Sequence, residues 1–223
     1  AIELSGTNYF QNFNDLANGL PIGWRVQTNA TASSLGVDVP FVFEQTNDWQ
    51  NFFHAFRNYA STTNNSGTLA LNTETHATQN TFTNRGPGVR LTGSGSDPSA
   101  AFVMQVSNTI GRFNFSLALD LNMLDVEARA NTWTIDYGFG TNPTSFTVLG
   151  TYGDPGVFGT TPTNFTFGSA LDDNASNIWI RVVTLSPSTG SGSRDTFGID
   201  NVSLGWRTNA APIANADVFT NVA

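Results

Sequence analysis

The sequence predicts an all-β fold in which two antiparallel sheets pack face to face. Three observations support this prediction: apolar residues recur at every second position in many segments, no segment has the period of an amphipathic helix, and turn residues separate the segments. About a dozen short strands joined by Gly, Asn and Pro turns are typical of a β-sandwich or a barrel. A polar face on the alternating strands favours two packed sheets.

The clearest strand covers residues 113–123. Its two faces differ in polarity, because alternate side chains of a strand point to opposite sides. One face carries Phe113, Phe115, Leu117, Leu119, Leu121 and Met123, and the other carries Asn114, Ser116, Asp120 and Asn122. We therefore expect one buried face and one solvated face, as in an antiparallel sheet.

Shorter runs of the same kind account for the rest of the chain. Strands are expected at residues 22–26, 37–43, 52–59, 68–71, 89–91, 102–106, 132–139, 146–149, 165–167, 178–185 and 197–204. A short helical piece is expected at 12–17. The similar segments 143–147 and 162–166 are interpreted as two strand starts around a hairpin, whose turn signal is Asp154-Pro155-Gly156. Residues 1–207 form one predicted domain, and 208–223 form a linker or tail towards a further domain.

The composition excludes several kinds of partner. The 223 residues carry a net charge of -8, nine Arg, no Lys and no Cys. An acidic surface without Lys does not suit nucleic acid, and no apolar run reaches the roughly 20 residues needed to insert into a membrane. Without Cys, disulfides and thiolate chemistry are excluded. With only 12% charged residues, Ser, Thr, Asn and Gly must solvate the surface.

Residues that could act as catalysts are few. Asp125 and Glu127 are the nearest approach to the two carboxylates that glycoside hydrolysis needs. They precede a predicted turn, so a solvated strand end is the preferred interpretation. The sequence therefore predicts that the protein is not an enzyme.

Aromatic residues next to polar ones indicate a binding surface. In residues 178–183, Trp179 and Arg181 lie on the face opposite Ile178, Ile180 and Val182. An indole ring beside a guanidinium can stack on a sugar and bind its hydroxyl groups, and Asp120 and Asn122 could complete such a surface. The alternative is structural: Trp179 plugs an edge of the sandwich, and Arg181 pairs with a carboxylate such as Asp136.

Calcium is the one cofactor that the sequence suggests. Five aspartates in or beside turns could supply the oxygen ligands that Ca²⁺ prefers, namely Asp15, Asp172, Asp173, Asp195 and Asp200. A structural ion that ties the N-terminal segment to the last strand is expected, with no single ligand set favoured.

Several sequence segments together resemble a jelly-roll module of secreted bacterial multidomain proteins. They include residues 9–16 with 19–24, 56–60, 101–111, 177–181 and 195–204, and the closing Ile-Asp-Asn-Val-Ser-Leu string is similar to the last strand of many carbohydrate-binding modules. The resemblance implies a jelly-roll sandwich without an active site of its own, and it implies structural calcium at Asp200. From its place in the N-terminal segment, Asp15 is the second metal ligand that we expect. The tail, residues 208–217, resembles the start of tandem repeats in bacterial surface proteins.

The sequence therefore predicts two alternative functions. The first is a non-catalytic extracellular module that binds a polysaccharide or cell-surface glycan, or acts in adhesion. The second is a structural module of an extracellular assembly, such as a surface layer, adhesin stalk or filament, that joins copies of itself through the C-terminal tail. Both place the protein outside a bacterial cell, secreted or at the cell surface.

Overall fold

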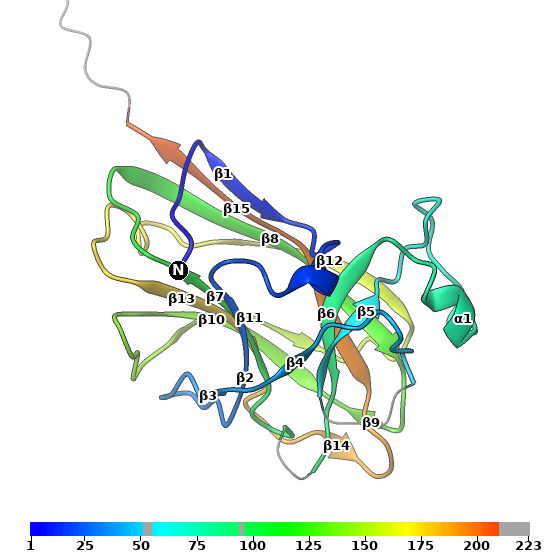
Figure 1. Ribbon diagram of the computed structural model, residues 1–223. Coiled ribbons are helices and arrows are strands. Elements are labelled where there is room, and N and C mark those ends of the chain that lie inside the picture. The colour runs from blue at the N-terminus through cyan, green and yellow to red at the C-terminus, as the bar shows by residue number, and fades with distance from the viewer. Residues whose placement is uncertain (51–54, 94–95, 210–223) are drawn as a thin grey trace, which may run out of the picture.

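The chain folds as a sandwich of two sheets. The computed structural model describes residues 1–50, 55–93 and 96–209 (Figure 1). The seven-stranded sheet follows the order β12 (Gly159–Thr166), β8 (Arg112–Asp125), β15 (Thr196–Thr208), β6 (Arg85–Arg90), β5 (Phe56–Ala60) and β4 (Phe41–Val42), with β1 (Asn8–Gln11) also paired to β15. The predicted antiparallel two-sheet jelly-roll sandwich is confirmed, and only the short pair β4–β5 of the two main sheets is parallel.

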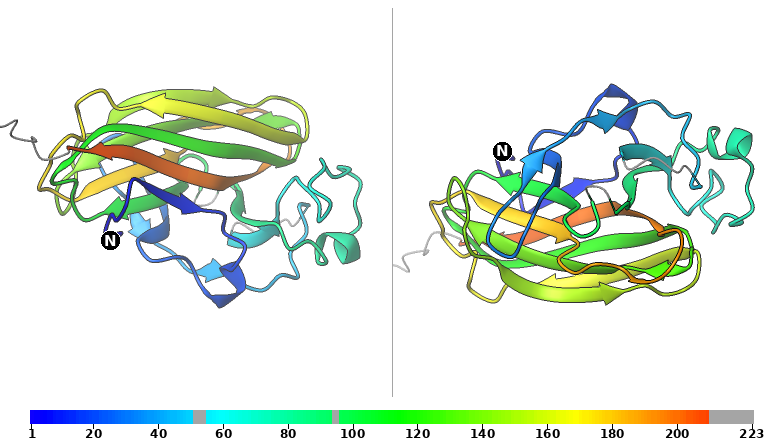
Figure 2. Two further views of the ribbon diagram at one scale, coloured as in Figure 1. Left: turned by 90° about the horizontal axis from the view of Figure 1, so that it is seen from above. Right: turned by 90° about the horizontal axis from the view of Figure 1, so that it is seen from below.

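The second sheet has six strands. Its order is β11 (Thr147–Gly153), β10 (Thr132–Phe139), β13 (Ile178–Val183), β7 (Ala101–Val106), β2 (Trp24–Thr28) and β3 (Val37–Asp38). The short strands β9 (Arg129–Ala130) and β14 (Thr189–Gly190) form a separate pair at one end. Figure 2 shows the two layers from above and from below.

The core lies between the sheets and follows the predicted alternation. From β8, Phe115, Leu117, Leu119, Leu121 and Met123 are buried, and they face the buried Ile178, Ile180 and Val182 of β13 within one apolar cluster. Aromatic rings join the layers: Trp133 of β10 stacks on Phe197 of β15 with ring centroids 4.2 Å apart. The regular alternation therefore fixes which face of each strand is buried.

Residues 61–84 form a cap over one end of the seven-stranded sheet, and they include the only α-helix of the described residues, α1 (His76–Gln79). In Figures 1 and 2 the helix projects beyond that end of the sandwich. Beneath the cap, its residues Ala70 and Phe82 pack in a second small apolar cluster with Trp49, Tyr59, Ala60 and Leu124. Trp49 Nε1 donates to the carbonyl oxygen of Ala60 at 2.8 Å. The sequence did not predict this segment as a unit, because its apolar residues follow no regular period.

Three other expectations differ from the structure. The helical piece expected at 12–17 is a single 3₁₀ turn, η1 (Leu16–Asn18). The strands β11 and β12 do not form a hairpin, because β11 pairs with β10 and β12 pairs with β8 in the opposite sheet. The strand expected at 68–71 is absent, and these residues contribute only an isolated bridge between Leu69 and Thr63. Of the strand expected at 52–59, residues 52–54 lie outside the described part.

The last strand, β15, continues to Thr208, and residues 210–223 lie outside the described part of the chain. The linker or tail expected at 208–223 therefore stays a prediction.

Candidate functional site

The four residues predicted to form one binding surface lie on opposite sides of the sandwich. Trp179 and Arg181 project outwards from the six-stranded sheet, because their neighbours on β13 enter the core. Asp120 and Asn122 project outwards from the seven-stranded sheet for the same reason. The expected joint surface is therefore wrong, since the whole core separates its two halves.

Trp179 and Arg181 are also covered by protein. The Arg181 side chain is fully buried: it pairs with both carboxylate oxygens of Asp136, at 2.8 and 2.7 Å, and donates to the carbonyl oxygens of Thr31 and Ser34. The Phe146 ring lies 3.3 Å from its Cζ. These contacts match the structural alternative for Arg181, because the side chain is fully buried and a sugar cannot reach it.

Asn122 and Asp200 belong to a buried polar chain under the cap. The Oγ of Ser61 donates to Asp200 Oδ2 at 2.7 Å and accepts from Asn122 Nδ2 at 3.2 Å. Thr160 Oγ1 donates to Asn122 Oδ1 at 2.8 Å. Asp120 is half-buried and accepts from Asn201 Nδ2 at 2.8 Å. Both side chains predicted to bind ligand on this face thus already have protein partners.

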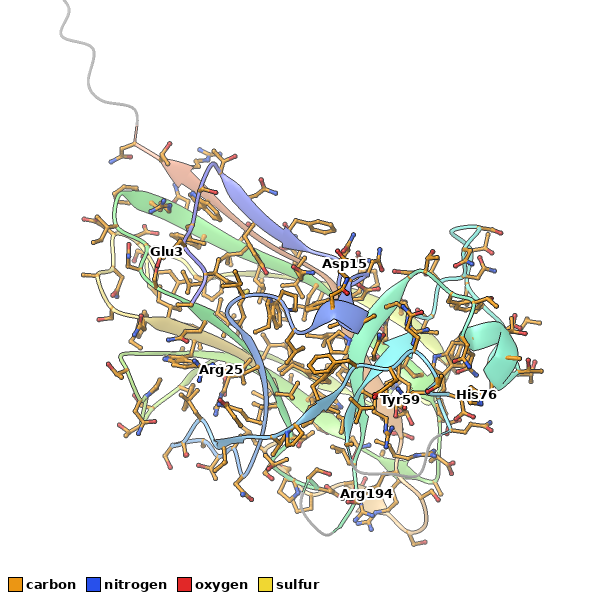
Figure 3. All side chains as sticks on the ribbon, in the orientation of Figure 1. Glu3, Asp15, Arg25, Tyr59, His76 and Arg194 are labelled. Atoms are coloured by element: carbon orange, nitrogen blue, oxygen red, sulfur yellow. The ribbon has the colours of Figure 1, made fainter. Side chains whose placement is uncertain are left out.

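The predicted calcium ligands Asp200 and Asp15 do not belong to a cluster of metal-binding side chains in the described part of the chain. Asp200 is 1% exposed, whereas Asp15, which directly precedes η1, is exposed (Figure 3). Among the described residues, no three His, Cys, Asp or Glu side chains gather where they could hold a metal ion. Burial raises the pKa of Asp200 to about 7, which indicates a proton on this carboxyl group at mildly acidic pH.

Asp125 and Glu127 share one cation instead of flanking a cleft. The Nη2 of Arg90 contacts the carboxylates of both, and its distance to Glu127 Oε1 is 2.7 Å. Arg90 Nε also donates to the carbonyl oxygen of Arg194 at 2.8 Å. This arrangement is that of an ion-paired strand end, in agreement with the preferred interpretation of these residues.

A groove with ligand-binding character lies on the outer face of the six-stranded sheet. It has a volume of about 450 Å³ and crosses the ends of β2 and β3, and we call it the β2–β3 groove. Its lining comprises Arg25, Gln27, Leu35, Gly36, Val37, Asp38, Thr141, Asn142 and Trp179. Trp179 is the one predicted site residue that reaches it, and Figure 3 shows Arg25 in this region.

The floor of the β2–β3 groove is apolar and its walls are polar. Arg25 lies over the Trp179 ring, with Cζ 5.2 Å from the ring centroid, and the ring is only 4% exposed. Arg25 Nη1 is 3.3 Å from Asp38 Oδ2, and Gln27 Nε2 donates to Asp38 Oδ1 at 2.8 Å. The Trp179 ring therefore lies beneath the Arg25 guanidinium. The prediction of an exposed ring that could stack on a sugar is wrong.

Gln27 places an unpaired acceptor beside the groove. Its side chain is buried, and its Oε1 has no hydrogen-bond partner in the described structure. An unpaired buried acceptor costs about 1–3 kcal/mol. This oxygen has almost no accessible surface, so a ligand donor reaches it only when the Gln27 side chain turns towards the groove. The side chains of Arg25 and Asp38, 40% and 57% exposed, remain accessible beside it.

A larger hollow of about 560 Å³ lies on the opposite sheet, lined by Thr7, Asn114, Ser116, Gly205, Trp206 and Arg207. Trp206 donates its Nε1–H to the carbonyl oxygen of Gly6 at 3.1 Å. Among the described residues of this hollow, no buried side-chain atom lacks a partner.

The sequence did contain a signal for the groove. Trp24 and Val26 of β2 are core residues, so alternation places Arg25 and Gln27 together on the outer face. What it did not contain is the proximity of β3 and the 140–142 loop, which depends on strand order.

No family model matches the chain, and no curated protein sequence is similar to it. Among solved structures, it is similar to the CBM22-1–GH10 modules of a Clostridium thermocellum xylanase complexed with xylohexaose, at 13% identity and a TM-score of 0.47 over 90% of this chain and 29% of that one. An adhesin domain of Lys-gingipain from Porphyromonas gingivalis gives 12% identity and 0.47, over 92% and 100% of the two chains.

A Stig cyclase from Fischerella sp. gives 15% identity and a TM-score of 0.47, covering 91% of this chain and 90% of that one. These proteins have different functions, so function must be inferred from the residues of this chain. No helix in the described part has the length and apolar character to cross a membrane.

Proposed function

We propose that this chain is a non-catalytic extracellular module that binds a neutral polysaccharide or cell-surface glycan in the β2–β3 groove. The observation that carries the proposal is an open groove that presents the accessible side chains of Arg25 and Asp38, beside the buried and unpaired Oε1 of Gln27. A sugar hydroxyl group can donate to the Asp38 carboxylate and accept from the Arg25 guanidinium. Secretion or display at the surface of a bacterial cell belongs to the same proposal.

Charge favours a neutral ligand. The one cation and the one anion of the groove, Arg25 and Asp38, pair with each other, so the groove offers hydrogen bonds without a net charge. The protein as a whole carries -8, which opposes acidic polymers and nucleic acid. A hydroxyl-rich, uncharged chain is the partner that fits both features.

The two carboxyl groups whose pKa is raised to about 7 support a binding role over catalysis. Burial raises the pKa of Asp195 and of Asp200 to about 7, and these two side chains are 0% and 1% exposed. A general acid must reach the glycosidic oxygen. Neither carboxyl group is at the surface, so burial accounts for their protonation without a catalytic role.

The proposal is tested by affinity gel electrophoresis against a panel of soluble neutral polysaccharides, including xylan, β-glucan and mannan. We expect at least one to retard the protein, and we expect Arg25→Ala and Asp38→Ala each to weaken that retardation about tenfold, as for the loss of a hydrogen bond to a charged group. Arg207→Ala is the matched control, because this exposed arginine lines the hollow on the other sheet.

Retardation lost in Arg207→Ala but kept in Arg25→Ala would place the site on the seven-stranded sheet and contradict the proposal. Absence of retardation by every polysaccharide would leave the assembly module as the function. That alternative depends on residues 210–223, outside the described part, and self-association through them stays a prediction.

A further inference from the structure

The two charged side chains of the β2–β3 groove are oriented by their neighbours. Asp38 accepts from Gln27 Nε2 through Oδ1 at 2.8 Å, so its second oxygen, Oδ2, is the one turned to Arg25. Arg25 donates through Nη1 to that Oδ2 at 3.3 Å and through Nη2 to Gln105 Oε1 at 3.2 Å. The ring of Trp179 packs under the guanidinium, with its centroid 5.2 Å from Cζ. A carboxylate and a guanidinium therefore lie side by side before any ligand arrives, which lowers the entropic cost of binding.

Both groups retain hydrogen-bonding capacity for a ligand. A guanidinium carries five N–H groups, and two of those of Arg25 donate to partners among the described residues. The Oδ2 of Asp38 has a second lone pair beside its contact with Arg25. The two side chains are 40% and 57% exposed, so the remaining donors and the remaining lone pair are accessible from the groove.

The spacing of the pair matches two hydroxyl groups on neighbouring carbons of a sugar ring. Such hydroxyl oxygens, in a gauche arrangement, are about 3 Å apart, close to the 3.3 Å between Arg25 Nη1 and Asp38 Oδ2. One hydroxyl oxygen can accept from Nη1 while its neighbour donates to Oδ2, and the two hydrogen bonds then run parallel. A single hydroxyl group that served both atoms would meet them at an angle of roughly 70°, well below the near-tetrahedral angle that it prefers. Two adjacent hydroxyl groups therefore fit the pair better than one does.

We propose that Arg25 and Asp38 select a vicinal diol, that is, two hydroxyl groups on adjacent carbons of one neutral sugar ring. This inference rests on the proposed function and narrows its ligand to a chemical class. Internal residues of a 1,4-linked glucan or xylan keep adjacent hydroxyl groups on C2 and C3. In a 1,3-linked chain the linkage occupies the oxygen between C2 and C4, and the equatorial hydroxyl groups left on these carbons are about 5 Å apart, too far for parallel bonds to the pair. The groove is therefore expected to discriminate between the two linkages.

The test compares gel retardation by two matched pairs of polymers, 1,4- against 1,3-linked glucan and 1,4- against 1,3-linked xylan. We expect the wild-type protein to bind the 1,4-linked member at least about tenfold more tightly, as for one hydrogen bond to a charged group. The polymer that binds best is also oxidised with periodate, which cleaves the C–C bond of a vicinal diol, and reduced with borohydride. This treatment should abolish retardation.

Two conservative variants test the role of the pair itself. Arg25→Lys keeps the charge and loses the planar fork, and Asp38→Asn places an NH₂ group where Oδ2 lies when its amide oxygen accepts from Gln27. Each variant should bind more weakly, and its preference for the 1,4-linked polymer should fall below about threefold. Arg207→Lys, in the hollow on the other sheet, is the matched control and should keep the full preference. Thermal unfolding checks that all three variants fold.

Equal binding of 1,4- and 1,3-linked polymers, or retardation that survives periodate, would overturn the diol assignment and leave the proposed function in place. An unchanged preference in both Arg25→Lys and Asp38→Asn would overturn it too, because the selection would then come from other residues. Absence of retardation by every polymer would overturn the proposed function and this inference together.

Discussion

Asp200 is a carboxyl group that the fold stabilises in its neutral form. It is buried beneath the cap, where Ser61 Oγ and the backbone N–H of Asn201 donate to its oxygens, and the charge of Asp120 lies close by. Burial is the largest cause that raises its pKa to about 7, and Asp120 adds to the shift. A carboxyl group with this pKa makes the stability of the protein depend on pH in an unusual direction.

The folded state holds the Asp200 proton more tightly than the unfolded state, whose pKa is near 3.8. Its stabilising contribution is therefore full below about pH 4 and is lost as the pH rises through about 7. We expect Asp200→Asn, which is neutral at every pH, to be more stable than wild type at pH 8 by on the order of 2 kcal/mol. Urea unfolding at pH 5, 6, 7 and 8 in EGTA measures this.

Asp195 also makes the free energy of unfolding fall as the pH rises from about 4 to about 7, since its pKa is likewise raised to about 7. Asp200→Asn should therefore reduce the pH dependence without abolishing it, and the exposed Asp15→Asn should leave it unchanged. Equal slopes for wild type and Asp200→Asn would show that Asp200 is already ionised at pH 5.

At the scale of single elements, the buried pair of Arg181 and Asp136 holds the 29–36 loop against the six-stranded sheet. Arg181 is the link, because it binds Asp136 of β10 and the carbonyl oxygens of Thr31 and Ser34 at once. The same loop carries Leu35 and Gly36 into the wall of the β2–β3 groove. Arg181 and Asp136 thus position a wall of the β2–β3 groove, although neither residue lines the groove.

We expect Arg181→Met to lower the free energy of unfolding by about 3–5 kcal/mol, because it leaves Asp136 buried without its cation. The double variant Arg181→Met/Asp136→Leu should lose less than the sum of the two single changes. Urea unfolding of the four proteins measures this coupling. Arg25→Ala, which breaks an exposed ion pair, is the control and should cost about 1 kcal/mol or less. Strictly additive losses would contradict a coupled pair.

The strands illustrate what local pattern can and cannot predict. Alternation identified both faces of β8 and the orientation of Trp179 and Arg181, because the pleat fixes alternate directions. It did not reveal that the 29–36 loop and Phe146 cover Arg181, or that the cap covers Asn122. A polar residue on an outer face is solvated only if no other segment packs there, and that depends on distant parts of the chain.

At the scale of the whole molecule, strand order decides which outer faces can act together. The sequence predicted two sheets but not their membership, so residues on β8 and β13 were assigned to one surface although the core separates them. The β2–β3 groove and the polar chain under the cap both arise where segments far apart in sequence meet. Their separation is visible in Figure 3, where Arg25 marks the groove and His76 marks the cap.

The central claim is that a neutral glycan binds at the β2–β3 groove, and two indole N–H groups report on it directly. Trp179 Nε1–H donates to the Gly140 carbonyl oxygen beside this groove, and Trp206 Nε1–H donates to the Gly6 carbonyl oxygen beside the opposite hollow. In a ¹⁵N-edited NMR titration with whichever polysaccharide retards the protein, we predict that the Trp179 indole signal shifts and that of Trp206 stays fixed. A shift of Trp206 with a fixed Trp179 would contradict the account.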